Sequence, residues 1–290
     1  MIVMQQYLNA LRFILEKGAI KHDRTDTGTK AVFGMQFRYD MEDGFPLVTT
    51  KKMPWKSVAS ELLWFIEGSN DERRLAELLH GTRDPEKQTI WTQNANASYW
   101  KPHAKFEGDL GRIYGVQWRH WNSNGKEIDQ LARAIDLIKK DPTSRRIIVS
   151  AWHPGELDYE EQQPPVTALC PCHIFYQFFV ASGKLSLQMY QRSCDMLLGV
   201  PFNIASYSLL LNMVAQVTGL KAGDFVHTLG DAHIYQNHFE QVKEQLSREP
   251  FPLPSLWLNP SIKSIDNFKM DDIRIDNYQS HPAIKAPMAV

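Results

Sequence analysis

Two of the three cysteines in this 290-residue chain stand together in the stretch TALCPCHIFYQF, from Thr167 to Phe178. Four interpretations of this cluster are open: a set of metal ligands, a disulfide, a buried strand that contains sulfur, or a nucleophile. Zinc usually needs about four nitrogen or sulfur ligands in two spaced pairs, and the sequence offers one pair only. Cys170 and Cys172 are also too close for an easy disulfide in extended chain. Cys172 is therefore either a small core residue or a nucleophile, and a nucleophile needs neighbours that lower its thiol pKa.

Arginines at the ends of predicted strands are the candidate neighbours. Arg145 and Arg146 begin the apolar run RRIIVSAW, Arg192 and Ser193 end another run in YQRSCD, and Arg24 lies in HDRTDTGT. Taken singly, each arginine is typical of a solvated strand end. Taken together, forked guanidiniums and a hydroxyl suit a phosphate dianion.

Four further polar residues interrupt apolar segments. Glu61 is the one acid in the helical pattern WKSVASELLWFI. Asn203 precedes an apolar helix, so it is either an N-cap or a reader of the donor–acceptor edge of a planar ring. His233 and Tyr235 share a face if GDAHIY is extended, and either bind hydroxyls or are ordinary half-buried residues.

The elements that must position these residues follow from hydrophobic periodicity. The pattern predicts helices over residues 5–17, 55–66, 128–140 and 203–218. It predicts a strand around TKAVFGMQFRYDM, a strand at RRIIVSAW and a hairpin that turns at ASGK. Residues 69–109 are polar and irregular and indicate surface loops around Trp91. Because strands and helices mix without a βαβ rhythm, we expect one α+β domain over residues 1–290.

The composition excludes several classes of protein. The chain is 43% hydrophobic and 22% charged with a formal net charge of -1, which is ordinary for a globular domain and gives no general attraction to nucleic acid or an acidic membrane. The N-terminus lacks the pattern of a signal peptide, and no apolar run predicts a membrane span. Three cysteines make no full disulfide set, so we expect a reducing, cytoplasmic location.

A series of longer strings resembles the thymidylate synthase family, in the same order and over nearly the whole chain. The strings are DGFPLVTTKK, ELLWF, TSRRIIVSAW, PCH, YQRSCD, PFNIASY, GDFVHTLGDAHIY, LSREP and HPAIKAPMAV. The resemblance implies an α+β subunit with a long buried helix and a large mixed sheet that forms the interface of a homodimer. It also implies dUMP and 5,10-methylenetetrahydrofolate as substrates, and no metal.

The resemblance implies covalent chemistry at Cys172. The thiolate attacks C6 of the uracil, and C5 takes up the folate methylene. The proton on C5 is then removed, tetrahydrofolate is eliminated, and its hydride reduces the exocyclic methylene, giving dTMP and dihydrofolate. Thiolate addition makes the poorly nucleophilic C5 reactive. Cys170 is expected to pack in a strand.

Roles for the other residues are implied in the same way. The phosphate is expected to bind Arg24, Arg192 and Ser193 with Arg145 and Arg146 of the partner subunit. Asn203 is expected to read the base, and His233 and Tyr235 to bind the deoxyribose. The remaining implied site residues are Glu61 as a proton-handling carboxylate whose pKa burial would raise, Tyr114 and His173 as supporting groups, Asp195 for catalysis and for both substrates, and Trp91, Ala289 and Val290 for the folate.

The chain departs from the usual family pattern at Thr92 and Asp26 and has a longer approach, DYEEQQPPVTA, to the nucleophile. Thr92 and this approach lie near the hydrophobic wall of Trp91 and Leu169, so the sequence leaves open a dUMP hydroxymethylase, in which water captures the methylene. A dCMP hydroxymethylase is disfavoured, because an acid at position 203 would suit cytosine better. A non-catalytic binding dimer on the same fold, for example an RNA-binding or regulatory one, is disfavoured by the near-neutral charge and the intact catalytic set.

Overall fold

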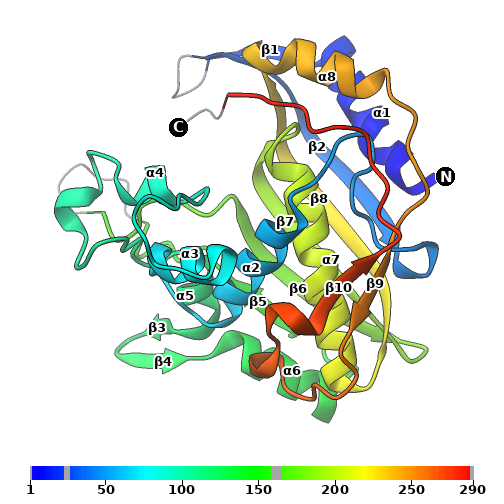
Figure 1. The fold of residues 1–290 in the computed structure, drawn as a ribbon. Coiled ribbons are helices and arrows are strands. Elements are labelled where there is room, and N and C mark those ends of the chain that lie inside the picture. Colours follow the sequence, from blue (N-terminus) through cyan, green and yellow to red (C-terminus); the bar gives the residue numbers. More distant parts are fainter. Residues whose placement is uncertain (1, 23–26, 158–164, 288–290) are drawn as a thin grey trace.

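The computed structural model describes residues 2–22, 27–157 and 165–287. In these residues, six strands form one sheet (Figure 1). Their order across the sheet is β1 (Ala19–Lys21), β2 (Thr29–Asp40), β8 (Lys221–Tyr235), β7 (Lys184–Asp195), β6 (His173–Ala181) and β5 (Ile148–Ser150). Strands β7 and β8 run parallel, and the other neighbours run antiparallel. The chain therefore has the mixed α+β sheet that the sequence predicted.

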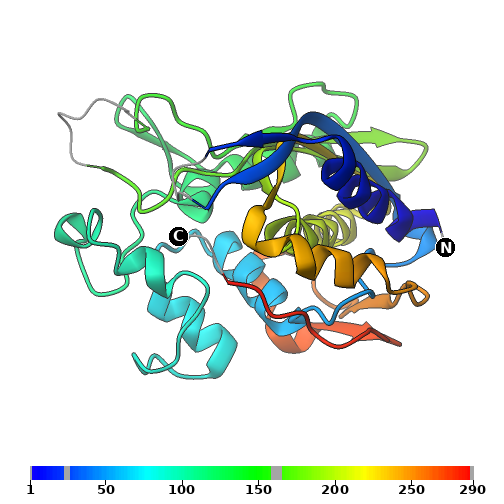
Figure 2. The same cartoon turned by 90° about the horizontal axis from the view of Figure 1, so that it is seen from above.

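One face of the sheet is covered by a long core helix, α7 (Gly199–Thr218), which packs on β7 and β8. In Figure 2, α7 is seen nearly end-on between the sheet and α2 (Trp55–Ile66). Helix α7 ends at Gly219, whose φ of 74° is left-handed and favours glycine. By length and composition alone α7 could cross a membrane, although the sequence predicted no such run. It is a core helix here, because 78% of its apolar window is buried.

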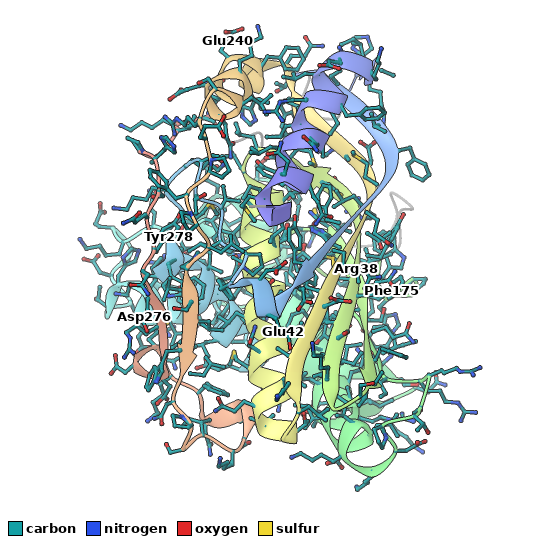
Figure 3. The ribbon with its side chains drawn as sticks, turned by 90° about the vertical axis from the view of Figure 1, so that its right-hand side faces the viewer. Arg38, Glu42, Phe175, Glu240, Asp276 and Tyr278 are labelled. Carbon is teal, nitrogen blue, oxygen red and sulfur yellow. The ribbon has the colours of Figure 1, made fainter. Side chains whose placement is uncertain are left out.

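The two faces of the sheet differ in their side chains. Tyr176, Met189, His227 and Phe37 stand opposite one another across β6, β7, β8 and β2, and each is at most 3% exposed. The adjacent row consists of Phe175, Tyr190, Thr228 and Gln36, and it points to the other face because side chains alternate along a strand. Phe175 is 38% exposed and lies on the side of the sheet away from α7 (Figure 3).

The remaining elements surround this core. The helices are α1 (Ile2–Lys17), α3 (Glu72–His80), α4 (Thr92–Ala95), α5 (Tyr114–Arg119), α6 (Gln130–Lys140) and α8 (Phe239–Leu246). Two small antiparallel pairs join β3 (Trp121–Ser123) to β4 (Lys126–Ile128) and β9 (Ser255–Leu258) to β10 (Ile273–Asp276). Short 3-10 turns cover Met41–Asp43, Lys101–His103, Gln236–His238, Ile265–Asn267 and Met270–Asp272.

Three expectations about local structure are corrected. Residues 69–109 are not all loop, because α3 forms where Asp71 caps two backbone amides and Gly81 ends the helix in a left-handed conformation. Helix α7 begins at Gly199, four residues before the expected start at Asn203. Cys170 lies in the loop before β6 rather than in a strand.

Candidate active site

The loop that carries Cys172 is held by Arg192 of β7. The Arg192 amide donates to the Cys172 carbonyl at 2.7 Å, its Nε to the Pro171 carbonyl at 2.7 Å and its Nη2 to the Cys170 carbonyl at 3.1 Å. Three consecutive residues are thus fixed against the neighbouring strand. Cys170 and Cys172 are both free thiols. Arg192 contributes a charge to the site and also sets the position of the candidate nucleophile.

The pKa of the Cys172 thiol reflects two opposing effects. Burial raises it above the ordinary value, while the positive charge of Arg192 and hydrogen bonds with Tyr114 and Ser193 oppose the rise. Arg192 lowers the pKa of the thiol, as expected, but the increase caused by burial is larger. The thiol therefore needs a group that takes up its proton as it attacks.

Aromatic rings form a rigid floor beside Cys172. The Tyr114 ring, at the start of α5, stacks on His173 with centroids 3.9 Å apart and ring planes at 12°. The Nδ1 of His173 is 2.6 Å from the Tyr207 hydroxyl. Burial, followed by the nearby His227, lowers the pKa of His173 to about 3, so the imidazole is neutral at physiological pH. The floor thus supports the loop without adding charge.

Glu61 lies on α2 and is 8% exposed. Trp91 Nε1 donates to Glu61 Oε1 at 2.7 Å. Burial raises the pKa of Glu61 to about 7, and the bond from Trp91 limits the rise. A carboxyl group with this pKa exchanges protons readily near neutral pH, which is the property a general acid–base residue needs.

A cavity of about 480 Å³ opens beside Glu61. Its walls include Ile90, Leu198 and Phe202 among apolar residues, and Lys51 and Lys52 at a polar part. Burial lowers the pKa of Lys51 to about 8, although the charge of Asp195 opposes this. The lysines and Phe202 were not predicted as site residues. The signal was present in VTTKK and PFN, but one sequence does not show that these stretches meet.

Asp195 and Asn203 lie at the junction of β7 and α7. One carboxylate oxygen of Asp195 accepts from the amides of Leu197 and Leu198 at 3.0 and 3.1 Å. Asn203 lies in the second turn of α7, so the N-cap interpretation is wrong. A Cβ placed on Gly199 would stand 3.7 Å from Asp195 Cβ and 3.8 Å from Asn203 Oδ1, so both side chains border Gly199.

His233 and Tyr235 are neighbours near the end of β8, with ring centroids 5.2 Å apart. The Nδ1 of His233 is 3.3 Å from the Asp231 carboxylate, which also pairs with Lys21. The hydrogen bond with His233 and the contact with Lys21 hold the pKa of Asp231 at about 2. In the neutral imidazole whose Nδ1 donates to this carboxylate, Nε2 is an acceptor and can receive a hydrogen bond from a ligand hydroxyl.

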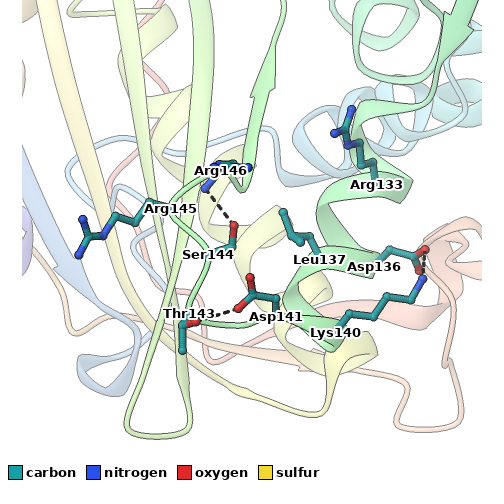
Figure 4. Close-up of a pocket in the computed structure, with 9 residues that line it drawn as sticks. All are labelled: Arg133, Asp136, Leu137, Lys140, Asp141, Thr143, Ser144, Arg145 and Arg146. Carbon is teal, nitrogen blue, oxygen red and sulfur yellow. Dashed lines mark hydrogen bonds and ion pairs between the residues drawn. The ribbon is translucent and has the colours of Figure 1, made fainter.

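Arg145 and Arg146 do not join this cluster within one subunit. Both are exposed and line a basic hollow of about 760 Å³ with Arg133 and Lys140 of α6 (Figure 4). The Arg145 carbonyl accepts from Gln177, five residues along the chain from Cys172. At about 3.3 Å per strand residue that is roughly 16 Å. Neither arginine side chain therefore reaches Cys172 itself within one subunit.

Several expected residues lie outside the described part of the chain. They are Arg24, expected to bind phosphate, Asp26 in the same loop, and Ala289 and Val290, expected to contact the folate. The segment 158–164 of the approach to Cys172 is also outside it. Within the described residues, no group of three or more His, Cys, Asp or Glu is placed to hold a metal ion.

A comparison with protein families agrees with the resemblance found in the sequence. The family model described as thymidylate synthase matches residues 5–290. The match covers nearly the whole chain, so it includes every described residue of the site.

Proposed function

Because the chain belongs to the thymidylate synthase family, we propose that it converts dUMP and 5,10-methylenetetrahydrofolate to dTMP and dihydrofolate. The observation that carries the proposal is the placement of Cys172 in a loop fixed by Arg192, with its amide bonded to the buried Tyr114, which also interacts electrostatically with Glu61. Tyr114 thus links a nucleophile to a proton-handling carboxyl group, the two functions that the proposed reaction needs.

In the proposed reaction, Cys172 Sγ adds to C6 of the uracil and the electron pair moves toward C5 and O4. Arg192 stabilises the thiolate, because its guanidinium faces the loop that carries the sulfur. Asn203 offers an NH2 to O4 and a carbonyl to N3–H of the base. Glu61, with its pKa of about 7, exchanges protons with the base through ordered water.

The folate supplies the methylene and the hydride when it is bound. The cavity beside Glu61 fits such a group, because Ile90, Leu198 and Phe202 offer apolar surface to a flat ring system. Lys51 and Lys52 on the same cavity suit the carboxylates of the folate tail. Ala289 and Val290 are proposed to close over it, and Asp195 and Trp91 to contact it.

We further propose a homodimer that forms through the outer face of the sheet. Phe179 is 65% exposed, Ile148 46% and Phe175 38%, and exposed large apolar side chains on one sheet face are typical of a protein interface. Such a dimer would let Arg145 and Arg146 reach the phosphate in the partner's site. The free thiols favour a cytoplasmic location for this enzyme.

The test is an activity assay of the purified chain with dUMP and methylenetetrahydrofolate. We expect nucleotide that has gained a methyl group and an equal amount of dihydrofolate, measured by mass and by absorbance. Hydroxymethylated nucleotide without dihydrofolate would instead establish the hydroxymethylase. No modified nucleotide in any condition, with the protein folded and dUMP bound, would refute both activities.

A further inference from the structure

A buried ion pair at the start of α3 lies outside the residues assigned above. Glu72 is 2% exposed and Arg73 is 6% exposed. Arg73 Nε donates to Glu72 Oε2 and Arg73 Nη2 to Glu72 Oε1, each at 2.7 Å. A buried pair of charges costs free energy unless further hydrogen bonds satisfy both groups. The other hydrogen-bond partners of Glu72 and Arg73 therefore identify the part of the chain that the ion pair holds in place.

The other partners of the two side chains lie in the segment that follows α3 and ends at Thr92, the first residue of α4. Glu72 Oε1 accepts from the hydroxyls of Thr89 and Thr92 at 2.6 and 2.7 Å. Arg73 donates to the carbonyls of Asp84 and Lys87 at 2.7 and 3.2 Å. The ion pair thus fastens residues 84–92 at four points. The position where the sequence departs from the family, Thr92, is one of these points.

The fastened segment carries three residues of the site, and one of them, Thr89, both bonds to Glu72 and lines the cavity. Ile90 lines the cavity, and Trp91 donates to Glu61. The Thr89 and Thr92 hydroxyls also bond the local backbone: Trp91 N donates to Thr89 Oγ1 at 3.1 Å, and Thr89 N donates to Thr92 Oγ1 at 2.8 Å. The backbone on both sides of Ile90 is therefore anchored to one buried carboxylate.

We propose that Glu72 is a positioning residue that acts through Thr89, Thr92 and Trp91 to hold the donor to Glu61 in place. The catalytic value of this link rests on the proposed function, but the link itself does not. Glu72 is not among the described residues that line the cavity, and the hydrogen bonds of its side chain go to Arg73 and the two threonines. Its influence must therefore pass through the segment that it fixes.

The other titratable groups that face Glu61 come from different elements. Tyr114 of α5 and Tyr207 of α7 both interact electrostatically with Glu61, and burial raises the pKa of each well above its ordinary value, so both stay neutral. Lys51 and Lys52 line the same cavity. Within this set the Trp91 indole is the neutral donor that favours the ionised carboxylate. Moving Trp91 away is expected to raise the pKa of Glu61 further.

The experiment measures the titration of Glu61 without turnover, from the protonated-carboxyl band in infrared difference spectra. The band is assigned as the one that Glu61→Gln removes. Thr92→Val keeps the shape of the side chain but removes its hydroxyl, and Thr92→Ser is the matched control that keeps it. Glu72→Gln keeps an acceptor but removes the charge, and it tests the carboxylate directly.

We expect Thr92→Val and Glu72→Gln each to raise the pKa of Glu61 by about one unit, while Thr92→Ser leaves it near the wild-type value. In the turnover assay, the acidic limb of kcat should move by the same amount with little change in KM for dUMP. Folded Thr92→Val and Glu72→Gln proteins with an unmoved Glu61 titration would overturn the inference. If the wild-type protein shows no turnover but the two variants still raise the pKa of Glu61, the positioning link stands and the proposed function fails.

Discussion

The amide of Cys172 donates to the hydroxyl of Tyr114 at 2.8 Å, while its carbonyl accepts from the amide of Arg192 at 2.7 Å. The backbone of the candidate nucleophile is therefore held on both sides. Because the Tyr114 hydroxyl accepts from this amide, its own proton is available to a second acceptor, and hydrogen bonding with Tyr114 lowers the thiol pKa against the effect of burial. The relationship couples the position of Cys172 to its reactivity.

Separate replacement of Cys170 and Cys172 tests which of the two thiols is the nucleophile. We expect Cys172→Ser to reduce kcat by at least about a thousandfold while dUMP still binds, because the proposed phosphate and base contacts do not use the sulfur. Cys170→Ala should retain most activity, since only its carbonyl bonds to Arg192. Calorimetry with dUMP and the turnover assay measure the two effects. An inactive Cys170 variant beside an active Cys172 variant would reverse the assignment.

The sequence was sufficient to predict helices and strands where the local hydrophobic pattern agrees with the burial of the side chains. The helix over residues 55–66 and the hairpin at ASGK are where the periodicity placed them. The apolar helix after YQRSCD was predicted too, but its start was placed four residues late, because Gly199 and Pro201 are weak helix formers and the tertiary contacts of α7 override that weakness.

Other features depend on residues that meet only in the folded chain. Helix α3 was missed because the charged residues in DERRLAELLHG obscure its buried side, formed by Leu75 and Ala76 with the Glu72–Arg73 pair. The partnership of Glu72 with Thr92 spans 20 residues and has no periodic signature. Lys51 was overlooked for a similar reason, since its Nζ donates to the distant carbonyl of Leu197.

Complementation tests the proposed shared site. Arg146→Ala should be inactive because a phosphate contact is lost in every site, and Cys172→Ser should be inactive because the nucleophile is lost. In a mixed dimer, one of the two sites would combine an intact Cys172 with an intact Arg146 of the partner subunit. About a quarter of wild-type activity is expected after full exchange of equal amounts, because half of the dimers are mixed. Exchange is verified with two affinity tags, and a mixture that exchanges but stays inactive would contradict the shared site.

A charge on the outer face of the sheet should prevent dimer formation. Phe179 is 65% exposed on β6, so Phe179→Asp should fold normally but bring a carboxylate into the proposed interface. We expect a monomer in sedimentation and a loss of activity of at least about a hundredfold, since Arg145 and Arg146 would no longer reach a second site. Phe106→Asp, at a 45% exposed residue away from this sheet, is the matched control and should remain dimeric. A dimeric, active Phe179→Asp protein would place the interface elsewhere.

The buried carboxyl of Glu61 gives a pH dependence of stability with a defined sign. Its pKa in the folded chain is about 7, above the ordinary 4.5, so the folded state binds this proton more tightly. The stabilisation is complete below about pH 4.5 and is lost as the pH rises through about 7. Over this window the loss amounts to about 3 kcal/mol, at about 1.4 kcal/mol per unit.

Glu61→Gln is neutral at every pH and should not show that loss. Between pH 5 and pH 8, we expect the free energy of unfolding of Glu61→Gln to rise by about 2.5 kcal/mol relative to that of the wild type, measured by urea unfolding. Glu107 is exposed, so Glu107→Gln is the control, and its free energy of unfolding should change with pH as that of the wild type does. A constant difference between Glu61→Gln and wild type would mean that Glu61 is not shifted.

Asn203→Asp tests how the base is read. Uracil offers an acceptor at O4 and a donor at N3, which one amide matches with its NH2 and its carbonyl. A carboxylate facing uracil opposes the O4 acceptor with another acceptor, whereas it can accept from the N4 amine of cytosine. An unpaired buried group costs on the order of 1–3 kcal/mol, so the ratio of kcat/KM for dUMP over dCMP should fall by about one to two decades.

The structure sharpens this prediction, because Asn203 lies inside α7 and its replacement removes no helix cap. A carboxylate there would stand near Asp195, whose negative charge is within reach of the same part of the helix. Melting temperatures for wild type and Asn203→Asp therefore accompany the kinetics, with Asn203→Ala as a variant that has neither polarity nor charge. If both variants fold and the nucleotide ratio stays at the wild-type value, Asn203 does not read the base, and its place beside Asp195 must be explained by the packing of β7 against α7.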